Sequence, residues 1–145
     1  MKKVEIKNIS KTFGDLHTLD DISLSLAKNE FVTILGPSGS GKSTVFNIIA
    51  GLSMPDKGQV FIEGEEYTGK TGRVSYMHQK DLLLPWKNIL ENVTVPLILK
   101  GSSKKDAENE ALKNFQLFGL DGFENNYPNQ LSGGMRQRAS LLRTY

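Results

Sequence analysis

The apolar positions of this 145-residue chain follow one period in the first half and another in the second. In the first half, short apolar runs are separated by Gly, Asp, Asn and Pro, which is typical of β-strands joined by turns. Residues 22–26 alternate like a half-exposed antiparallel strand, whereas 31–35 are apolar on both faces, like a strand buried in a parallel sheet. We therefore expect a mixed sheet. The predicted strands are residues 4–9, 22–26, 31–35, 59–62 and 74–77.

The second half has the spacing of helices. Apolar residues recur at intervals of four, four and three along a charged segment that Gly119 can end, and helical spacing also follows Ser132, a good N-cap. The change of pattern places a boundary between residues 79 and 86. We therefore predict an α/β fold with a sheet-containing part over 1–79 and a helical part over 80–145. The apolar positions that carry these helices are Ala107, Ala111, Phe115 and Phe118, then Met135, Ala139 and Leu142.

Composition excludes several classes of partner and site. The 18 Lys and Arg against 16 Asp and Glu give a net charge of +2 without a dense basic patch, so we expect no nucleic-acid partner. The chain has no Cys, which excludes disulfides and thiolate metal sites and fits a reducing cytosol. The longest apolar clusters, 82–86 and 95–99, are far shorter than the ~20 residues that cross a bilayer. Any membrane role therefore needs a partner.

The strongest chemical signal is a glycine-rich loop. Residues 36–44, GPSGSGKST, fit the Walker A or P-loop pattern G-x-x-x-x-G-K-[ST] and stand between the predicted buried strand and an apolar, helix-like stretch. Glycines let backbone N–H groups converge on phosphate oxygens, and the following helix N-terminus adds the positive end of its dipole. The alternative is a Gly-Ser turn with a solvated lysine. We predict nucleotide binding by Gly36, Ser38, Gly39, Ser40, Gly41, Lys42, Ser43 and Thr44.

Two side chains of this loop have distinct expected roles. Lys42 would place its charge on the β- and γ-phosphates, and the Ser43 hydroxyl would ligate Mg²⁺. A second glycine-rich element, LSGGMRQR at residues 131–138, also precedes a helical pattern and can present N–H groups to an anion. Taken alone it is ambiguous, because an N-cap serine followed by glycines also begins ordinary helices.

Together, the two glycine-rich elements resemble the nucleotide-binding subunit of ATP-binding cassette (ABC) transporters, whose signature reads LSGGQ followed by basic residues. The resemblance covers the whole chain, with Met135 in place of the usual Gln. It implies that Phe13 stacks on adenine and that Gln79 approaches Mg²⁺ and the attacking water. Lys42 and Gln79 would then serve catalysis. The alternatives are a core aromatic at Phe13 and a solvated loop residue at Gln79.

The same resemblance implies protein partners. In this family two subunits face each other head to tail, so Ser132, Gly133 and Gly134 of one subunit contact ATP held by the other. A transmembrane permease binds the helical subdomain, which places an importer's ATP-binding subunit in the cytoplasm, on the inner face of the membrane. The apolar residues between 79 and 99 form either the docking groove for that permease or the core of the helical part. Within them, LLPW at 83–86 looks most like the nitrate, sulfonate, taurine and pyrimidine importer group.

Two parts of the family's chemistry do not occur in this sequence. The family uses an Asp-Glu pair (Walker B) and a later switch histidine, but there is no Asp-Glu dipeptide, and His17 and His78 both precede the signature. We therefore expect an incomplete P-loop NTPase fold, the N-terminal portion of an importer ATPase with a mixed sheet and a helical subdomain. We expect no ATP hydrolysis by these 145 residues alone. The alternatives are a soluble ABC-type ATPase acting on ribosomes or DNA and a non-catalytic ATP-binding fragment.

Overall fold

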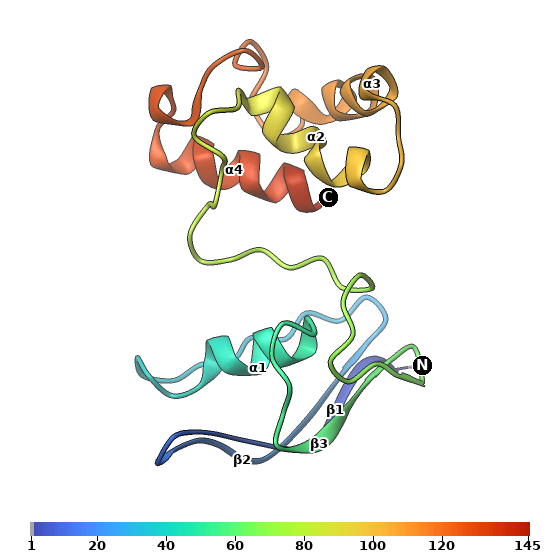
Figure 1. Cartoon of the computed structure of the whole chain (residues 1–145), viewed down its shortest axis with the longest axis vertical. Helices are drawn as coiled ribbons and strands as arrows, with labels where there is room; N and C mark the ends of the chain where they lie inside the picture. The colour runs from blue at the N-terminus through green and yellow to red at the C-terminus, as the bar shows by residue number, and fades with distance from the viewer. Residues whose placement is uncertain (1) are drawn as a thin grey trace. The chain divides into compact units, whose positions relative to one another are not determined.

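The computed structural model describes residues 2–145 and forms two compact units, which divide between Val74 and Ser75. The first contains the strands and one helix, and the second contains the remaining helices (Figure 1). We call them the sheet unit and the helical unit and describe each by itself. The division lies a few residues before the boundary that the sequence pattern indicates.

The sheet unit is built on an antiparallel sheet in the order β2-β1-β3-β4. Ile6 of β1 pairs with Leu24 of β2 on one side and with Val60 of β3 on the other. β1 is therefore held by strands from two distant stretches of sequence. The strands are β1 (Lys2–Phe13), β2 (Leu16–Ala27), β3 (Lys57–Ile62) and β4 (Glu65–Glu66).

A single short helix packs against this sheet. Helix α1 (Lys42–Ile49) follows the glycine-rich loop, as the apolar stretch after the loop predicts (Figure 1). Its Val45 and Ile48 are three residues apart and therefore lie on one helix face, which is buried against the sheet. The buried cluster consists of Ile6, Ile9, Leu19, Val45, Ile48, Val60 and Ile62.

Three of the five expected strands are confirmed, and two are wrong. Residues 4–9, 22–26 and 59–62 lie within β1, β2 and β3, but 31–35 and 74–77 are irregular chain outside any strand. The reason is that a strand requires a neighbour for its backbone N–H and C=O groups. Within residues 2–145 neither segment has a strand partner, so the sheet described here is wholly antiparallel and the expected parallel strand does not form.

The helical unit forms around three helices and a short 3-10 turn. Their bounds are α2 (Ile89–Leu99), α3 (Lys104–Phe115), η1 (Pro128–Gln130) and α4 (Gly133–Thr144). The helix expected over residues 107–118 stops at Phe115, and Gly119 stands in the turn that follows, with a φ of +61°. The prediction of Ser132 as an N-cap is confirmed, because its side chain accepts a hydrogen bond from the Met135 N–H at 3.3 Å. The buried cluster is Leu83, Ile89, Val93, Ala111, Phe115, Leu120, Leu131, Ala139 and Leu142.

Candidate functional site

Two glycines of the glycine-rich loop have a backbone conformation that residues with a side chain rarely adopt. Gly39 and Gly41 have φ angles of +82° and +83°, in the left-handed region that favours glycine. A Cβ at Gly41 would also lie 2.7 Å from Leu19 Cδ2 and 2.8 Å from the Thr18 carbonyl oxygen. The end of the loop therefore packs against β2, and this contact gives a steric reason for glycine at position 41.

The Lys42 side chain spans this loop. Its ammonium donates hydrogen bonds to the Gly36 carbonyl at 2.8 Å, the Pro37 carbonyl at 2.5 Å and the Ser40 hydroxyl at 3.2 Å. A lysine ammonium has three donors, so the loop supplies one acceptor for each. The positive charge is thereby held over the loop rather than extended into solvent, and the alternative of a solvated lysine in a Gly-Ser turn does not describe it.

Helix α1 adds backbone donors beside this charge. Gly41 is its N-cap and provides no side-chain hydrogen bond, and no acidic residue lies in the first turn. The first N–H groups of an α-helix have no partner within the helix, and they form the positive end of its dipole. Ser43 is exposed in the same turn, where its hydroxyl offers a hard oxygen ligand of the kind that Mg²⁺ takes. The loop and the helix start therefore suit an anion accompanied by a divalent cation.

Phe13 lies in the same unit as this loop. It ends β1 with 51% of its surface exposed, which does not fit the alternative of a core aromatic. The ladder pairs Lys11 with Leu19, the residue that contacts the end of the glycine-rich loop. Phe13 therefore lies two residues along β1 from the residue that pairs with Leu19, where the loop packs against the sheet.

The second glycine-rich element begins α4 in the helical unit. Ser132, Gly133 and Gly134 are exposed, and neither glycine has a positive φ. A Cβ at Gly133 would meet only the end of the Arg136 side chain at 3.8 Å, and one at Gly134 would meet nothing within 4 Å. Packing within the described residues thus gives no steric reason for glycine at either position, unlike Gly41.

Gln79 also belongs to the helical unit and is exposed. The structure thus groups Phe13 and the P-loop residues in the sheet unit, and Gln79 with the signature residues in the helical unit. Two residues after Gln79, Asp81 is hydrogen-bonded to α4, the helix that begins with the signature residues. The Asp81 carboxylate accepts a hydrogen bond from Arg136 Nε at 3.1 Å, and its carbonyl accepts one from Arg143 at 2.7 Å. Burial lowers the pKa of Arg143, an effect opposed by nearby Asp81.

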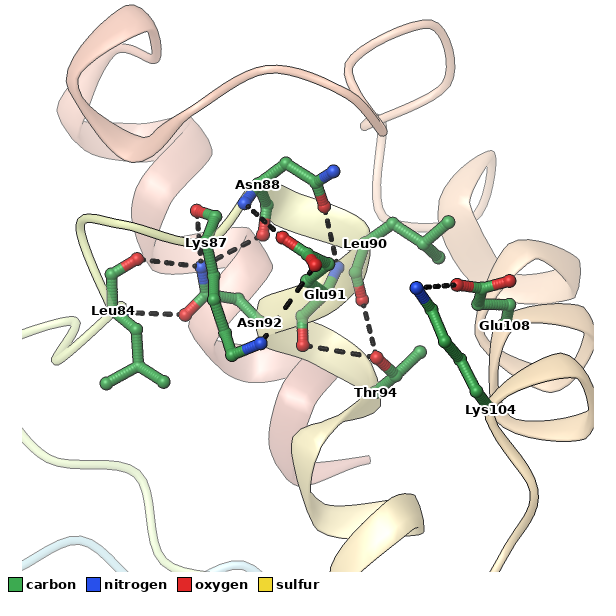
Figure 2. A network of polar contacts seen from close by, with 9 residues as sticks. All are labelled: Leu84, Lys87, Asn88, Leu90, Glu91, Asn92, Thr94, Lys104 and Glu108. Atoms are coloured by element: carbon green, nitrogen blue, oxygen red, sulfur yellow. Dashed lines mark hydrogen bonds and ion pairs between the residues drawn. The ribbon is translucent and has the colours of Figure 1, made fainter.

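The region between residues 79 and 99 divides into a packed part and an exposed part. Leu83, Ile89 and Val93 belong to the core, whereas Trp86 is 70% exposed. The turn that presents Trp86 is held by Asn92, which is fully buried. Figure 2 shows the Asn92 side chain directed into this turn, where it accepts a hydrogen bond from the Leu84 N–H at 2.6 Å and donates to the carbonyls of Leu84, Lys87 and Asn88. Leu83, Ile89 and Val93 therefore fit the alternative of a helical core, and the docking groove stays a prediction.

Sequence reasoning missed the polar residues that fix these segments. The capping box of Asn88 and Glu91 has a recognisable spacing and could have been found in advance. Arg143 and the ion pair between Lys11 and Asp56 gave no signal, because their partners are distant in sequence. Asn92 gave none because it bonds mainly to backbone groups, whose positions depend on the shape of the turn. Across residues 2–145, no helix combines the length and apolar character that crossing a membrane would require.

Comparisons with known proteins agree with this geometry. The family model described as ABC transporter matches residues 19–145. The chain is 42% identical over 146 residues to an uncharacterised ABC transporter ATP-binding protein of Methanocaldococcus jannaschii, covering 98% of this chain and 55% of that protein. It is 48% identical over 125 residues to the formylaminopyrimidine import ATP-binding protein ThiZ of Halalkalibacterium halodurans, covering 86% and 48%. It is 40% identical over 144 residues to the aliphatic sulfonates import ATP-binding protein SsuB of Bacillus cereus, covering 97% and 56%.

Solved structures show the same fold. A dimeric, post-hydrolysis state of the ATP-binding cassette MJ0796 bound to ADP and Pi matches with a TM-score of 0.85 and 35% identity, over 97% of this chain and 68% of that one. The ADP conformation of the cassette MJ1267 matches with a TM-score of 0.78 and 26% identity, over 99% and 64%. The chain spans about half the length of the curated relatives it matches. The expected α/β cassette fold of the P-loop NTPase type is confirmed as a partial domain, and the chain belongs to the ABC transporter family.

Proposed function

We propose that this chain binds ATP with Mg²⁺ at the glycine-rich loop of the sheet unit. The observation that carries the proposal is the Lys42 ammonium held across the loop, next to an uncapped helix start. On binding, Lys42 would exchange loop oxygens for β- and γ-phosphate oxygens, and the Ser43 hydroxyl would contribute to holding Mg²⁺. Phe13 would offer its exposed ring to the base. The other proposed phosphate-binding residues are Gly36, Ser38, Gly39, Ser40, Gly41 and Thr44.

The second part of the proposal concerns the subunit interface. Ser132, Gly133 and Gly134 would contact the nucleotide bound by a second nucleotide-binding subunit placed head to tail. The open space around both glycines supports this, because small residues permit the close approach of a phosphate group. Gln79 would act toward Mg²⁺ and the attacking water in the assembled site, so that Lys42 and Gln79 are the proposed catalytic residues.

The third part concerns transport. We propose that the chain is part of the ATP-binding subunit of an importer, attached to a membrane permease on the cytoplasmic face. The names of ThiZ and SsuB, which describe import of a formylaminopyrimidine and of aliphatic sulfonates, support an importer of small solutes and the assignment to the sulfonate and pyrimidine importer group. The exposed Trp86, held on its Asn92-fixed turn, would contact the permease. No nucleic-acid partner is proposed, since the net charge is only +2.

The chemistry of the chain's own residues follows from these positions. The bound nucleotide supplies the phosphoryl group, and Mg²⁺ supplies charge neutralisation. The loop N–H groups and Lys42 would orient the phosphates and stabilise negative charge on them, and Ser43 would fix the cation. Ser132, Gly133 and Gly134 of one subunit would then approach the P-loop of the other, so that nucleotide binding would be coupled to a movement of domains.

The phosphate-site proposal is tested by calorimetric titration of the chain with ATP and Mg²⁺. Lys42→Ala removes a charge-assisted contact, whose loss costs about 1.5 to 3 kcal/mol, or a Kd weaker by roughly 10- to 150-fold. Lys28→Ala, which alters an exposed lysine in the turn after β2, is the matched control and should leave the Kd unchanged. Equal affinity of wild type and Lys42→Ala would contradict the assignment of the loop.

The subunit proposal has a separate test. Ser132→Arg places a bulky side chain where a partner's phosphate would lie, so it should abolish ATP-dependent dimers in sedimentation experiments while the monomer's Kd for ATP stays within about twofold. Ser102→Arg, an equally bulky change at an exposed position before α3, should leave dimer formation intact. Dimers of unchanged stability in the Ser132 variant would show that the signature is only a helix start.

A further inference from the structure

The exposed ring of Phe13 is accompanied by a cation that the proposed function does not use. The Lys11 ammonium lies 5.4 Å from the centroid of the Phe13 ring, within the range of a cation–π interaction. The Lys11 side chain is only 16% exposed, which is unusual for lysine. The ammonium is therefore held beside the ring rather than free to move in solvent.

A single carboxylate holds the two residues that precede Phe13. Asp56, just before β3, accepts a hydrogen bond from Lys11 Nζ at 2.8 Å and another from the Thr12 backbone N–H at 2.7 Å. Its own N–H donates to the Ser10 carbonyl at 2.9 Å. The hydrogen bond from Lys11, and then that from Thr12, lower the pKa of Asp56, so its carboxylate stays ionised at neutral pH.

These contacts lie beside the proposed phosphate site. Lys11 pairs across the ladder with Leu19, and Leu19 contacts the end of the glycine-rich loop at Gly41. Residues opposite each other on antiparallel strands share a face of the sheet. The Asp56 contacts therefore fix the end of β1, which lies between Leu19, where the glycine-rich loop packs, and Phe13.

We propose that Lys11 and Asp56 form a positioning pair for the base of the nucleotide. The inference rests on the proposed ATP site and extends it. Lys11 occupies one face of the Phe13 ring and leaves the other face for a base, while Asp56 fixes the ammonium and the Thr12 backbone together. A ring held in one position loses less conformational freedom when a base stacks on it. The pair acts on the base alone, and the phosphates are bound by Lys42 and the loop.

The sheet unit contains a second ion pair that serves as a control. Lys3 and Glu63 also connect β1 to a residue flanking β3, and the hydrogen bond from Lys3 lowers the pKa of Glu63. Glu63 follows β3, whereas Asp56 precedes it, so the two pairs lie at opposite ends of the ladder. Glu63→Gln should therefore change the stability of the unit without changing the position of Phe13.

The experiment compares two ligands that share their phosphates. ATP and inorganic tripolyphosphate, each with Mg²⁺, are titrated into the chain by calorimetry, and the ratio of their Kd values measures the contribution of the nucleoside. Base–aromatic stacking makes ATP bind roughly 5- to 150-fold more tightly, and Phe13→Ala should remove this difference. Asp56→Ala should reduce it about 2- to 5-fold, with tripolyphosphate affinity within about twofold of wild type. Glu63→Gln should leave the ratio unchanged.

Lys11→Met is the second variant, because it keeps the aliphatic stem and the Asp56 side chain while removing the cation. It should reduce the ratio in the same direction as Asp56→Ala. An unchanged ratio in both variants, or an equal loss for ATP and tripolyphosphate, would overturn the positioning role while leaving the phosphate site intact. If wild type bound neither ligand, or if Lys42→Ala bound both as well as wild type does, the proposed function itself would fail and the inference with it.

Discussion

The sheet unit and the helical unit depend on contacts of different range. In the helical unit, residues beside each helix start satisfy its first N–H groups: Asn88 caps α2, Ser103 caps α3 and Ser132 caps α4. In the sheet unit, β1 pairs with β2 and also with β3, which follows only after the P-loop and α1. A cap needs its neighbours in sequence, whereas a strand needs a partner from elsewhere. The helical unit is therefore specified mainly by local chemistry, and the sheet unit by pairing.

Two segments of the sheet unit show what this difference means. Residues 22–26 and 31–35 both have strand-forming composition, but only the first has a neighbour with which to pair. The second lies outside any strand, with Phe31 91% and Leu35 87% exposed. Composition thus establishes what a segment can form, and the presence of a partner determines whether it forms.

The largest expected effect is the loss of stability from a substitution in the core of the helical unit. Phe115→Ala removes a fully buried ring from a cluster whose members all lie between Leu83 and Leu142, so we expect a loss of about 4 kcal/mol. Hydrogen exchange should show reduced protection of α2, α3 and α4, with protection of β1 and β3 retained. Leu112→Ala, on the same helix but 42% exposed, should cost much less. Equal loss of protection in both units would contradict separate cores.

An intermediate effect is expected from the buried amide that fixes the Trp86 turn. Asn92→Leu keeps the branched shape of the side chain but removes its hydrogen bonds to the Leu84 N–H and the Lys87 carbonyl, which should cost about 2 to 3 kcal/mol. Urea unfolding can be followed through Trp86, the one tryptophan of the chain. The matched control is Thr94→Val, because the Thr94 hydroxyl bonds only to the Leu90 and Glu91 carbonyls of its own helix (Figure 2). A larger loss from the control would show that contacts within the helix, not with the turn, dominate.

The smallest expected effect is a loss of stability of the sheet unit at acid pH. Hydrogen bonds from Lys2, Lys11 and Lys3 lower the pKa values of three sheet-unit carboxylates, which are Glu5, Asp56 and Glu63. Because these pKa values are lower in the folded state, their stabilising contribution is complete above the unfolded pKa values, near 4, and is lost as the pH falls through the folded ones. We expect reduced hydrogen-exchange protection of β1 below about pH 4.

This acid effect should be modest and weaker in high salt, because exposed ion pairs are screened. The Asn92 and Thr94 contacts of the helical unit involve amide and hydroxyl groups that do not titrate in this range, so the Leu84 N–H, which donates to Asn92, provides the internal reference. Protection of β1 that did not change between pH 6 and pH 3 would show that the ion pairs contribute nothing measurable to the sheet.

The candidate site could be predicted from the sequence where its residues are contiguous. The P-loop and the signature each lie within one short segment, so spacing predicted Lys42 and Ser43, and the family resemblance added Ser132. Lys11 and Asp56 escaped notice because their pairing joins two strands and depends on the register between them. The surroundings of Asn92 were hidden for a similar reason, since its partners belong to a turn rather than to its own helix.

By itself, the sequence determined the family, the helix starts, the apolar faces and the loop that suits phosphate. Each of these depends on residues close together along the chain, where periodicity, caps and glycine conformation act directly. Only the tertiary structure decided that residues 31–35 remain outside the sheet, that Trp86 is exposed while Leu83 is buried, and that Lys11 lies beside Phe13. These outcomes depend on which distant groups come together, because backbone pairing, burial and ion pairing all require a second partner that local sequence does not name.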